Sequence, residues 1–194
     1  MGTGYNDNYL KDFYRFDPNA ATGQQWTIVN GFGGYKRRYG TAFVIDDVAY
    51  ICCGENNSTL VDDLWKFDGS DWKQLRDIAD NDSDEDYDDD YAITRAGTVS
   101  FVIDGRGYIA TGTSSGVTSD YWVYDPEEDL WYGDSDDDYT PMTNVHNVSS
   151  GGSSRSYAVS FSTGKRGFVL SGSSGTSYFD DVYELLPYEQ EDVD

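Results

Sequence analysis

The sequence is poor in several residues on which common classes of protein depend. Its 194 residues include only two cysteines, four prolines and one histidine, His146. The cysteines, Cys52 and Cys53, are adjacent within an apolar run, which predicts small buried side chains on opposite faces of a strand. A disulfide framework is therefore not supported. No apolar run reaches the roughly 18 residues that a spanning helix needs, so direct membrane insertion is not expected.

Positive charge is also scarce. Thirteen lysine and arginine residues stand against 36 aspartate and glutamate residues, and the formal net charge is −23. Such a chain repels phosphates and anionic membrane surfaces, so nucleic acid is not expected as a partner. Cations and polar neutral ligands remain as candidates, and solubility alone is the simpler explanation of the charge.

Aromatic residues and glycine are abundant instead. The chain has 17 tyrosines and 21 glycines, and aromatic residues make up 16% of it. Amphipathic segments of helical length do not occur, whereas tyrosine, threonine and valine are typical of strands. The composition therefore predicts an all-β fold.

One pattern recurs through the chain in a fixed order. A phenylalanine is followed seven residues later by an aromatic residue and eleven residues later by glycine, and an arginine precedes it by five or six residues. An Asp-x-aromatic-x-aromatic block begins eight or nine residues after the glycine. The members are Phe43, Phe101 and Phe161; Tyr50, Tyr108 and Phe168; Gly54, Gly112 and Gly172; Arg38, Arg95 and Arg155; and Asp63, Asp120 and Asp181, with Asp12 opening an earlier block. Such a period predicts a repeat architecture.

Each repeat predicts four short strands. Asp-Asp at 46–47, Asp-Gly at 104–105 and Thr-Gly at 163–164 mark tight turns between the first two strands. The Asp-led block predicts the third strand, and a short strand around Trp26, Trp72 or Trp131 closes three of the units. One such sheet cannot cover both of its faces, so neighbouring sheets are expected to pack radially with aromatic side chains between them.

These residues resemble the kelch repeat, with its Arg-led first strand, glycine-ended second strand, Asp-x-Trp-x-Tyr/Phe-Asp block and closing tryptophan. The resemblance implies a kelch-type β-propeller of about three and a half four-stranded blades, which forms a partial ring or is completed by another chain or a missing N-terminal half. It weakens where Leu185-Leu186 replaces the aromatic-Asp pair. The segment from Gly4 to Asp17 is similar to kelch proteins of bacterial cell envelopes, which implies an extracellular or cell-surface location.

On this basis the chain divides into seven segments. Incomplete blades are expected at both ends, and two long acidic or polar loops separate the last three blades. The segments are a first blade (1–30), a second blade (31–76), an acidic loop (77–94), a third blade (95–133), a polar and acidic loop (134–154), a fourth blade (155–187) and an acidic tail (188–194).

The first long loop is a candidate calcium site. Dense carboxylates repel one another unless they are solvated, screened or bound to a cation, and calcium takes six to eight oxygen ligands. Asp80, Asp82 and Asp84 have the alternate spacing at which several carboxylates converge. The EF-hand pattern fails, because Glu85 stands where glycine is needed. Calcium is the one candidate cofactor, and a solvated acidic loop is the alternative.

The candidate ligand-binding residues are expected on one face, formed by the loops between second and third strands and the loops between blades. The first class of loop offers side chains for hydrogen bonding to a polar ligand, and the repeat arginines offer recognition of a carboxylate or of sugar hydroxyls. The residues are Asn56, Asn57, Ser114, Tyr178, Arg38, Arg95 and Arg155. The alternative for the arginines is pairing with neighbouring aspartates.

The sequence favours a non-catalytic scaffold that recognises a glycan or a protein. Galactose oxidase carries a distantly similar propeller, but its copper site needs two histidines and a Tyr–Cys crosslink, and this chain has His146 alone. Two alternatives remain. The chain is a segment of an enzyme whose site lies elsewhere, or it is a structural half-propeller that assembles with another chain, a second copy included.

Overall fold

The structure is a computed structural model that describes residues 1–79, 93–133 and 153–185. The expected calcium ligands Asp80, Asp82 and Asp84, most of both long loops and the acidic tail lie outside the described residues. The described chain contains 18 strands and no helix, which confirms the all-β prediction.

Four antiparallel sheets follow one another along the chain, and within each sheet the strands pair in sequence order. Two small hairpins extend sheets II and IV. Sheet I consists of β1 (Gly2–Tyr5), β2 (Tyr9–Phe16) and β3 (Trp26–Val29); sheet II of β4 (Thr41–Ile45), β5 (Val48–Cys52), β8 (Trp65–Phe67) and β9 (Trp72–Gln74); sheet III of β10 (Val99–Ile103), β11 (Arg106–Thr113), β12 (Val117–Asp125) and β13 (Leu130–Gly133); sheet IV of β14 (Val159–Ser162), β15 (Gly167–Leu170) and β18 (Val182–Leu185). The hairpins are β6 (Glu55–Asn56) with β7 (Thr59–Leu60), and β16 (Ser173–Ser174) with β17 (Ser177–Tyr178).

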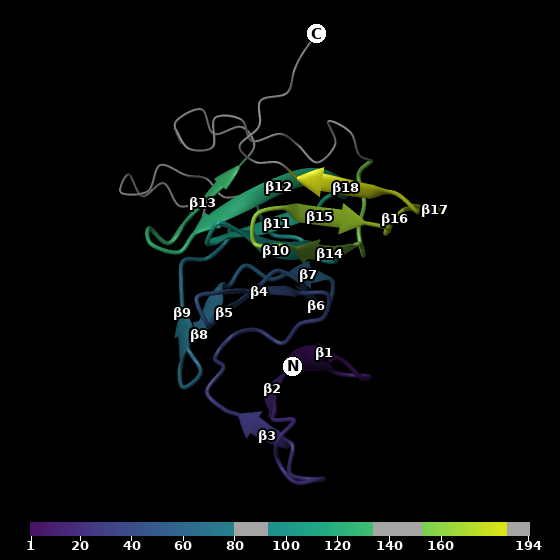
Figure 1. Cartoon of the computed structure of the whole chain (residues 1–194). Coiled ribbons are helices and arrows are strands. Elements are labelled where there is room, and N and C mark those ends of the chain that lie inside the picture. Colours follow the sequence, from purple (N-terminus) through teal and green to yellow (C-terminus); the bar gives the residue numbers. More distant parts are fainter. Residues whose placement is uncertain (80–92, 134–152, 186–194) are drawn as a thin grey trace.

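Sheets I, II and III follow one another from the bottom to the top of Figure 1, and sheet IV overlaps sheet III in this view. The first strands of sheets II, III and IV, which are β4, β10 and β14, are neighbours in space. Hydroxyl groups join them, because Thr41 Oγ1 donates to Ser100 Oγ at 2.7 Å and Ser160 Oγ donates to the Ser100 carbonyl at 2.7 Å. The repeat therefore places equivalent strands side by side along one edge of the stack.

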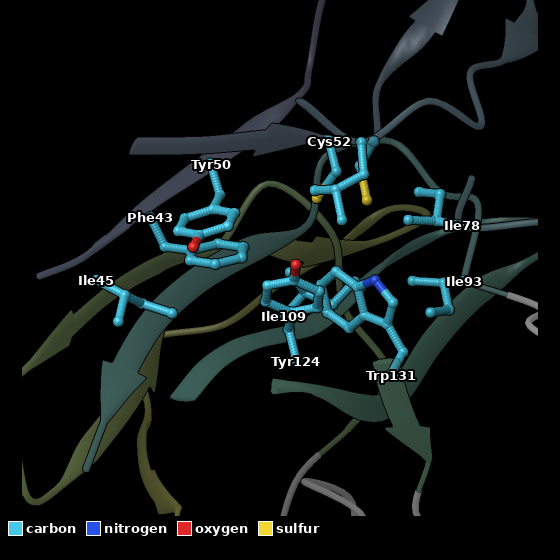
Figure 2. Packing of buried hydrophobic residues seen from close by; sticks show 11 residues of the cluster. Phe43, Ile45, Tyr50, Cys52, Ile78, Ile93, Ile109, Tyr124 and Trp131 are labelled. Atoms are coloured by element: carbon cyan, nitrogen blue, oxygen red, sulfur yellow. The ribbon is translucent and has the colours of Figure 1, made fainter. Parts of the chain in front are cut away.

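Aromatic side chains fill the space between consecutive sheets. Phe43 is 4% exposed and stacks on Tyr50 with ring centroids 5.2 Å apart, and the rings of Tyr124 and Trp131 from sheet III lie opposite them (Figure 2). Phe43 also lies against Gly107, where an added Cβ would come within 2.3 Å of its ring. A side chain at that glycine would exclude Phe43, so the absence of a Cβ is a requirement of the packing.

The same arrangement repeats between sheets III and IV. Phe101 stacks on Tyr108 and lies against Gly167, where a Cβ would come within 2.4 Å of the ring. The corresponding phenylalanine of sheet IV, Phe161, is 51% exposed, since no described sheet follows it. Burial of the repeat phenylalanine thus depends on the neighbouring sheet and not on its own.

Each second strand ends in two residues with left-handed backbone. These pairs are Thr3-Gly4, Cys53-Gly54, Thr111-Gly112 and Ser171-Gly172, and the first residue of each has φ between 59° and 61°. Strand alternation stops at this point. Cys52 and Cys53 are both fully buried, free and part of one cluster, which corrects the expectation that they point to opposite faces.

Two of the three predicted tight turns between first and second strands have the expected backbone. The prediction at Thr163-Gly164 is wrong, because the turn between β14 and β15 is longer and the Thr163 N–H donates to the Arg166 carbonyl at 3.0 Å. Asp46 and Asp47 have φ of 48° and 64°, and Asp104 and Gly105 have φ of 49° and 78°. Two successive positive φ values define the type I′ turn, whose twist matches that of the strands.

Candidate ligand-binding site

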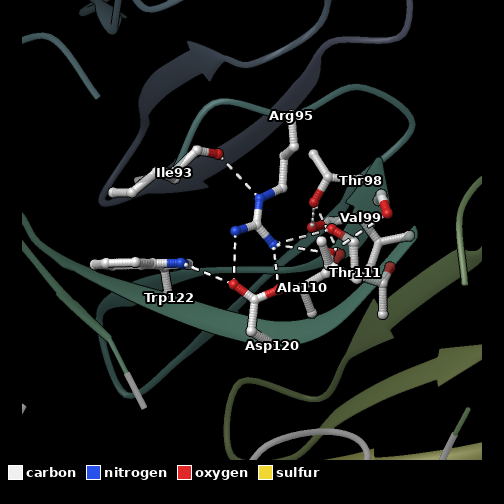
Figure 3. A network of polar contacts seen from close by, with 10 residues as sticks. Ile93, Arg95, Thr98, Val99, Ala110, Thr111, Asp120 and Trp122 are labelled. Carbon is white, nitrogen blue, oxygen red and sulfur yellow. Dashed lines mark hydrogen bonds and ion pairs between the residues drawn. The ribbon is translucent and has the colours of Figure 1, made fainter. Parts of the chain in front are cut away.

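The repeat arginines lie in the interior of the sheets. The guanidinium of Arg95 donates to Asp120 at 2.9 and 2.7 Å, to the Thr111 carbonyl at 3.1 Å and to the Ile93 carbonyl at 2.9 Å (Figure 3). Trp122 Nε1 donates to the same Asp120 carboxylate at 3.1 Å. Burial acts to raise the pKa of Asp120, but the hydrogen bonds and charge of Arg95 outweigh it and hold that pKa below its ordinary value.

Arg155 has the same environment in sheet IV. It donates to Asp181 at 2.6 and 3.0 Å and to the Ser171 carbonyl at 2.9 Å, and its side chain is fully buried. With 1% or less of their side chains exposed, Arg95 and Arg155 link the strands of their own sheets and are not presented to a ligand. The structure thus places them in the aspartate pairs that the sequence left as the alternative.

The counterpart of these arginines in sheet II is Arg37 and not Arg38, which is a correction. Arg37 is fully buried, donates to the Cys53 carbonyl at 3.1 Å and pairs with Asp63, whose side chain is 3% exposed. All three arginines stand six residues before the repeat phenylalanine. The sequence alone could not separate two adjacent arginines, because both satisfied the observed spacing.

Arg38 instead lies at the surface, among tyrosines. Its Nε donates to Glu55 Oε1 at 2.8 Å, and its guanidinium carbon is 5.3 Å from the ring centroid of Tyr5, 5.4 Å from that of Tyr9 and 4.8 Å from that of Tyr39. These distances are within the range of cation–π attraction. The Glu55 hydrogen bond raises the pKa of Arg38, so the group remains charged.

A polar cleft of about 300 Å³ lies beside this cluster. It is formed between the β1–β2 turn of sheet I and the β6–β7 hairpin of sheet II, which supply carboxylate, amide and phenol groups, and Lys36 from the loop between β3 and β4 adds an ammonium group. Its lining residues are Tyr5, Asp7, Asn8, Tyr9, Lys36, Asn56 and Asn57. Asn56 and Asn57, both expected from the sequence, therefore reach a cleft that also borders Arg38 through Tyr5 and Tyr9.

A tyrosine pair continues the surface on the other side of Arg38. The rings of Tyr39 and Tyr157 have centroids 5.1 Å apart, and the side chains are 44% and 54% exposed. The pair spans Gly97, whose N–H donates to the Tyr39 carbonyl at 3.0 Å and whose carbonyl accepts from the Tyr157 N–H at 2.8 Å. A Cβ at Gly97 would lie 2.8 Å from the Tyr157 ring. Partial burial raises the pKa of Tyr157, so its hydroxyl stays protonated at neutral pH.

Sequence reasoning missed the tyrosines of this surface. A signal for two of them exists, because Tyr39 and Tyr157 stand two residues after Arg37 and Arg155, and glycine occupies the same place after Arg95. All three positions have positive φ, between 55° and 65°. An alignment on Arg38 shifts Tyr39 by one position relative to Tyr157 and removes this signal.

The remaining expected residues lie on other hairpins. Ser114 is at the turn between β11 and β12, and Tyr178 is 86% exposed on β17. Figure 1 shows β6, β7, β16 and β17 on the same side of the stack, to the right in this view. Neither Ser114 nor Tyr178 lines the cleft.

No group of three or more His, Cys, Asp or Glu side chains suited to a metal ion is found in residues 1–79, 93–133 and 153–185. Within those same ranges, no helix is long and apolar enough to cross a membrane.

Comparisons with known proteins concern the fold. No protein-family model matches the chain, and no curated protein matches it. Among solved structures, one described as "Structure of YjhT" is similar, with a TM-score of 0.64 and 17% identity. The match covers 96% of this chain and 62% of that one, so the chain spans less than two thirds of this neighbour's length. The fold and the site define an all-β protein of successive antiparallel sheets with a polar, tyrosine-rich surface cleft.

Proposed function

We propose that the chain is a kelch-type β-propeller segment of about three and a half blades that binds a ligand without catalysing a reaction. Sheets I to IV correspond to the blades, and sheets I and IV have three strands each where II and III have four. Support comes from the adjacent first strands, the aromatic side chains between sheets and the likeness to a larger solved chain.

The ligand that the site suits best is a glycan. Sugars present hydroxyl groups along their edges and apolar C–H faces, and the cleft offers both kinds of partner. Asn56 and Asn57 line the cleft and supply amide groups, and Arg38 beside it supplies a guanidinium. Tyr5 and Tyr39, which are 51% and 44% exposed, supply partly exposed aromatic rings. The observation that carries the proposal is that these groups, from two sheets, form one continuous surface. An extracellular or cell-surface location agrees with this ligand and rests on the kelch resemblance.

The experiment is a glycan-array screen of the whole chain, with and without calcium, followed by titration of any glycan that binds. Two variants test the cleft. Asn56→Ala removes an amide, and Arg38→Met removes the charge while keeping much of the side-chain volume. The matched control is Ser114→Ala, at the equivalent hairpin of sheet III but outside the cleft.

We expect the cleft variants to weaken glycan binding by about five-fold and the control to leave it unchanged, because loss of a hydrogen-bonding group that contacts a ligand costs about 1 kcal/mol. If the chain binds no glycan but binds a protein through the same residues, the ligand of the cleft is a protein. An equal loss of glycan affinity in Ser114→Ala would show that the binding site is not the cleft.

A further inference from the structure

Two tyrosines have a backbone conformation that tyrosine rarely adopts. Tyr39 and Tyr157 have φ of 59° and 55°, and Gly97, at the same place in sheet III, has φ of 65°. A bulky residue is strained in this left-handed region, whereas glycine adopts it freely. Burial does not explain the tyrosines, because their side chains are 44% and 54% exposed. Backbone strain of this kind is concentrated at functional sites, so the two exposed rings are candidates for contact with a ligand.

Backbone hydrogen bonds fix these three positions in a row from sheet II to sheet IV. The Gly97 N–H donates to the Tyr39 carbonyl at 3.0 Å, and the Tyr157 N–H donates to the Gly97 carbonyl at 2.8 Å. The absence of a side chain at Gly97 leaves room for the Tyr157 ring, which a Cβ there would approach to 2.8 Å. The rings of Tyr39 and Tyr157 thereby meet, with centroids 5.1 Å apart and planes at 71°. We call these two rings the tyrosine platform.

Arg38 connects the tyrosine platform to the polar cleft. Its guanidinium carbon is 4.8 Å from the ring centroid of Tyr39 and 5.3 Å from that of Tyr5, which lines the cleft. The charge of Glu55, the hydrogen-bond partner of Arg38, also raises the pKa of Tyr157, after the larger effects of burial and of Tyr39. Neither platform ring lines the cleft itself. A sugar unit seated in the cleft is therefore separated from Tyr157 by Arg38 and Tyr39.

The cleft and the tyrosine platform offer different chemistry to a sugar. The amides in the cleft suit hydroxyl groups, whereas the negative face of an aromatic ring attracts the weakly positive C–H groups on the face of a sugar ring. Consecutive units of an oligosaccharide can satisfy both.

The charged groups of this surface balance one another. Lys36 and Asp7 both line the cleft, and Arg38 is paired with Glu55. The chain as a whole carries a net charge of −23 and repels anions. The surface therefore favours a neutral glycan over an acidic one.

We propose that the tyrosine platform is a second sugar subsite and that the ligand is a neutral oligosaccharide. One sugar unit lies in the polar cleft, and a further unit of the same chain stacks on the rings of Tyr39 and Tyr157. The inference rests on the proposed glycan-binding function and names its ligand class. It adds a requirement for chain length that the cleft alone does not impose.

The probes are the strongest binder of the glycan array and its shorter forms down to the monosaccharide, each titrated calorimetrically against the whole chain. Tyr157→Gly removes a platform ring and installs the residue that sheet III has at this position, where positive φ favours glycine. Tyr157→Phe keeps the ring. The matched control is Phe161→Ala, because Phe161 is 51% exposed in the same sheet and its ring stacks on Phe168, away from the platform. Urea unfolding of each variant separates lost binding from lost folding.

We expect Tyr157→Gly to bind the oligosaccharide about five-fold more weakly and the monosaccharide as the parent chain does, because only the longer ligand reaches the ring. Tyr157→Phe and Phe161→Ala should bind both ligands like the parent chain, whereas Asn56→Ala should weaken both.

Four outcomes would overturn the second subsite while the cleft variants still weaken binding. They are equal affinity for the monosaccharide and the oligosaccharide, unchanged oligosaccharide binding in Tyr157→Gly, an equal loss in Tyr157→Phe, and an acidic glycan as the strongest binder. If no glycan binds at all, the proposed function itself is wrong, and the subsite with it.

Discussion

Two adjacent arginines provide the sharpest test of how each repeat links its own strands. Arg37 is fully buried and pairs with Asp63, which is 3% exposed, whereas the Arg38 and Glu55 side chains are 30% and 20% exposed. Replacing Arg37 by methionine leaves the Asp63 carboxylate buried without its counter-charge and the Cys53 carbonyl without its donor at 3.1 Å. Replacing Arg38 by methionine leaves Glu55 within reach of water.

The expected costs differ several-fold. Removing one partner of a buried pair costs about 3–5 kcal/mol, which is a large fraction of the roughly 5–15 kcal/mol of a typical domain. A partly exposed pair contributes about 0–1 kcal/mol, and the tyrosine contacts of Arg38 add a comparable amount. We therefore expect Arg37→Met to lower the unfolding midpoint by about 10 °C and Arg38→Met by no more than about 4 °C.

The assay is unfolding by urea and by heat, followed by circular dichroism and tryptophan fluorescence, with both variants measured beside the parent chain. A glycan titration of Arg38→Met in the same preparation separates stability from binding. Equal destabilisation by the two substitutions would refute the assignment of Arg37 as the structural arginine. A larger loss of stability in Arg38→Met would show that Arg38, and not Arg37, corresponds to Arg95 and Arg155.

Three further outcomes follow from the packing and the charges. Phe101→Ala should lower the free energy of unfolding in urea by about 3–5 kcal/mol and Phe161→Ala by less than about 1 kcal/mol, because only the Phe101 ring is covered by a following sheet. Similar losses in the two variants would contradict the burial argument. Ser171→Gly should raise stability by about 0.5–1 kcal/mol, since Ser171 has φ of 59°, and a loss of stability would show that the serine side chain matters more than the backbone. Because Arg95 holds the pKa of Asp120 below its ordinary value, the contribution of the pair is complete above about pH 4 and is lost as pH falls through the lower pKa of the folded state. Asp120→Asn should therefore flatten the fall in stability between about pH 4 and pH 2, and an unchanged pH profile would exclude the pair as its cause.

A part of the fold and of the site follows from local sequence. The Asp46-Asp47 and Asp104-Gly105 turns were predicted because tight hairpins need two positive φ values, and the structure has them. Polar residues cluster between the second and third strands, and two of them, Asn56 and Asn57, line the cleft, while their contact with a ligand stays a prediction. These features depend on neighbours a few residues away.

The rest was decided by contacts between distant residues. Whether Arg37 or Arg38 is buried depends on Asp63, and the Tyr39–Tyr157 pair joins residues from different repeats. Local pattern alone predicted the strands and their order, because alternation and turn chemistry act over a few residues. Only the tertiary structure determined which charges lose their water and which ring faces stay exposed, since burial of a side chain is set by the neighbouring sheet that covers it.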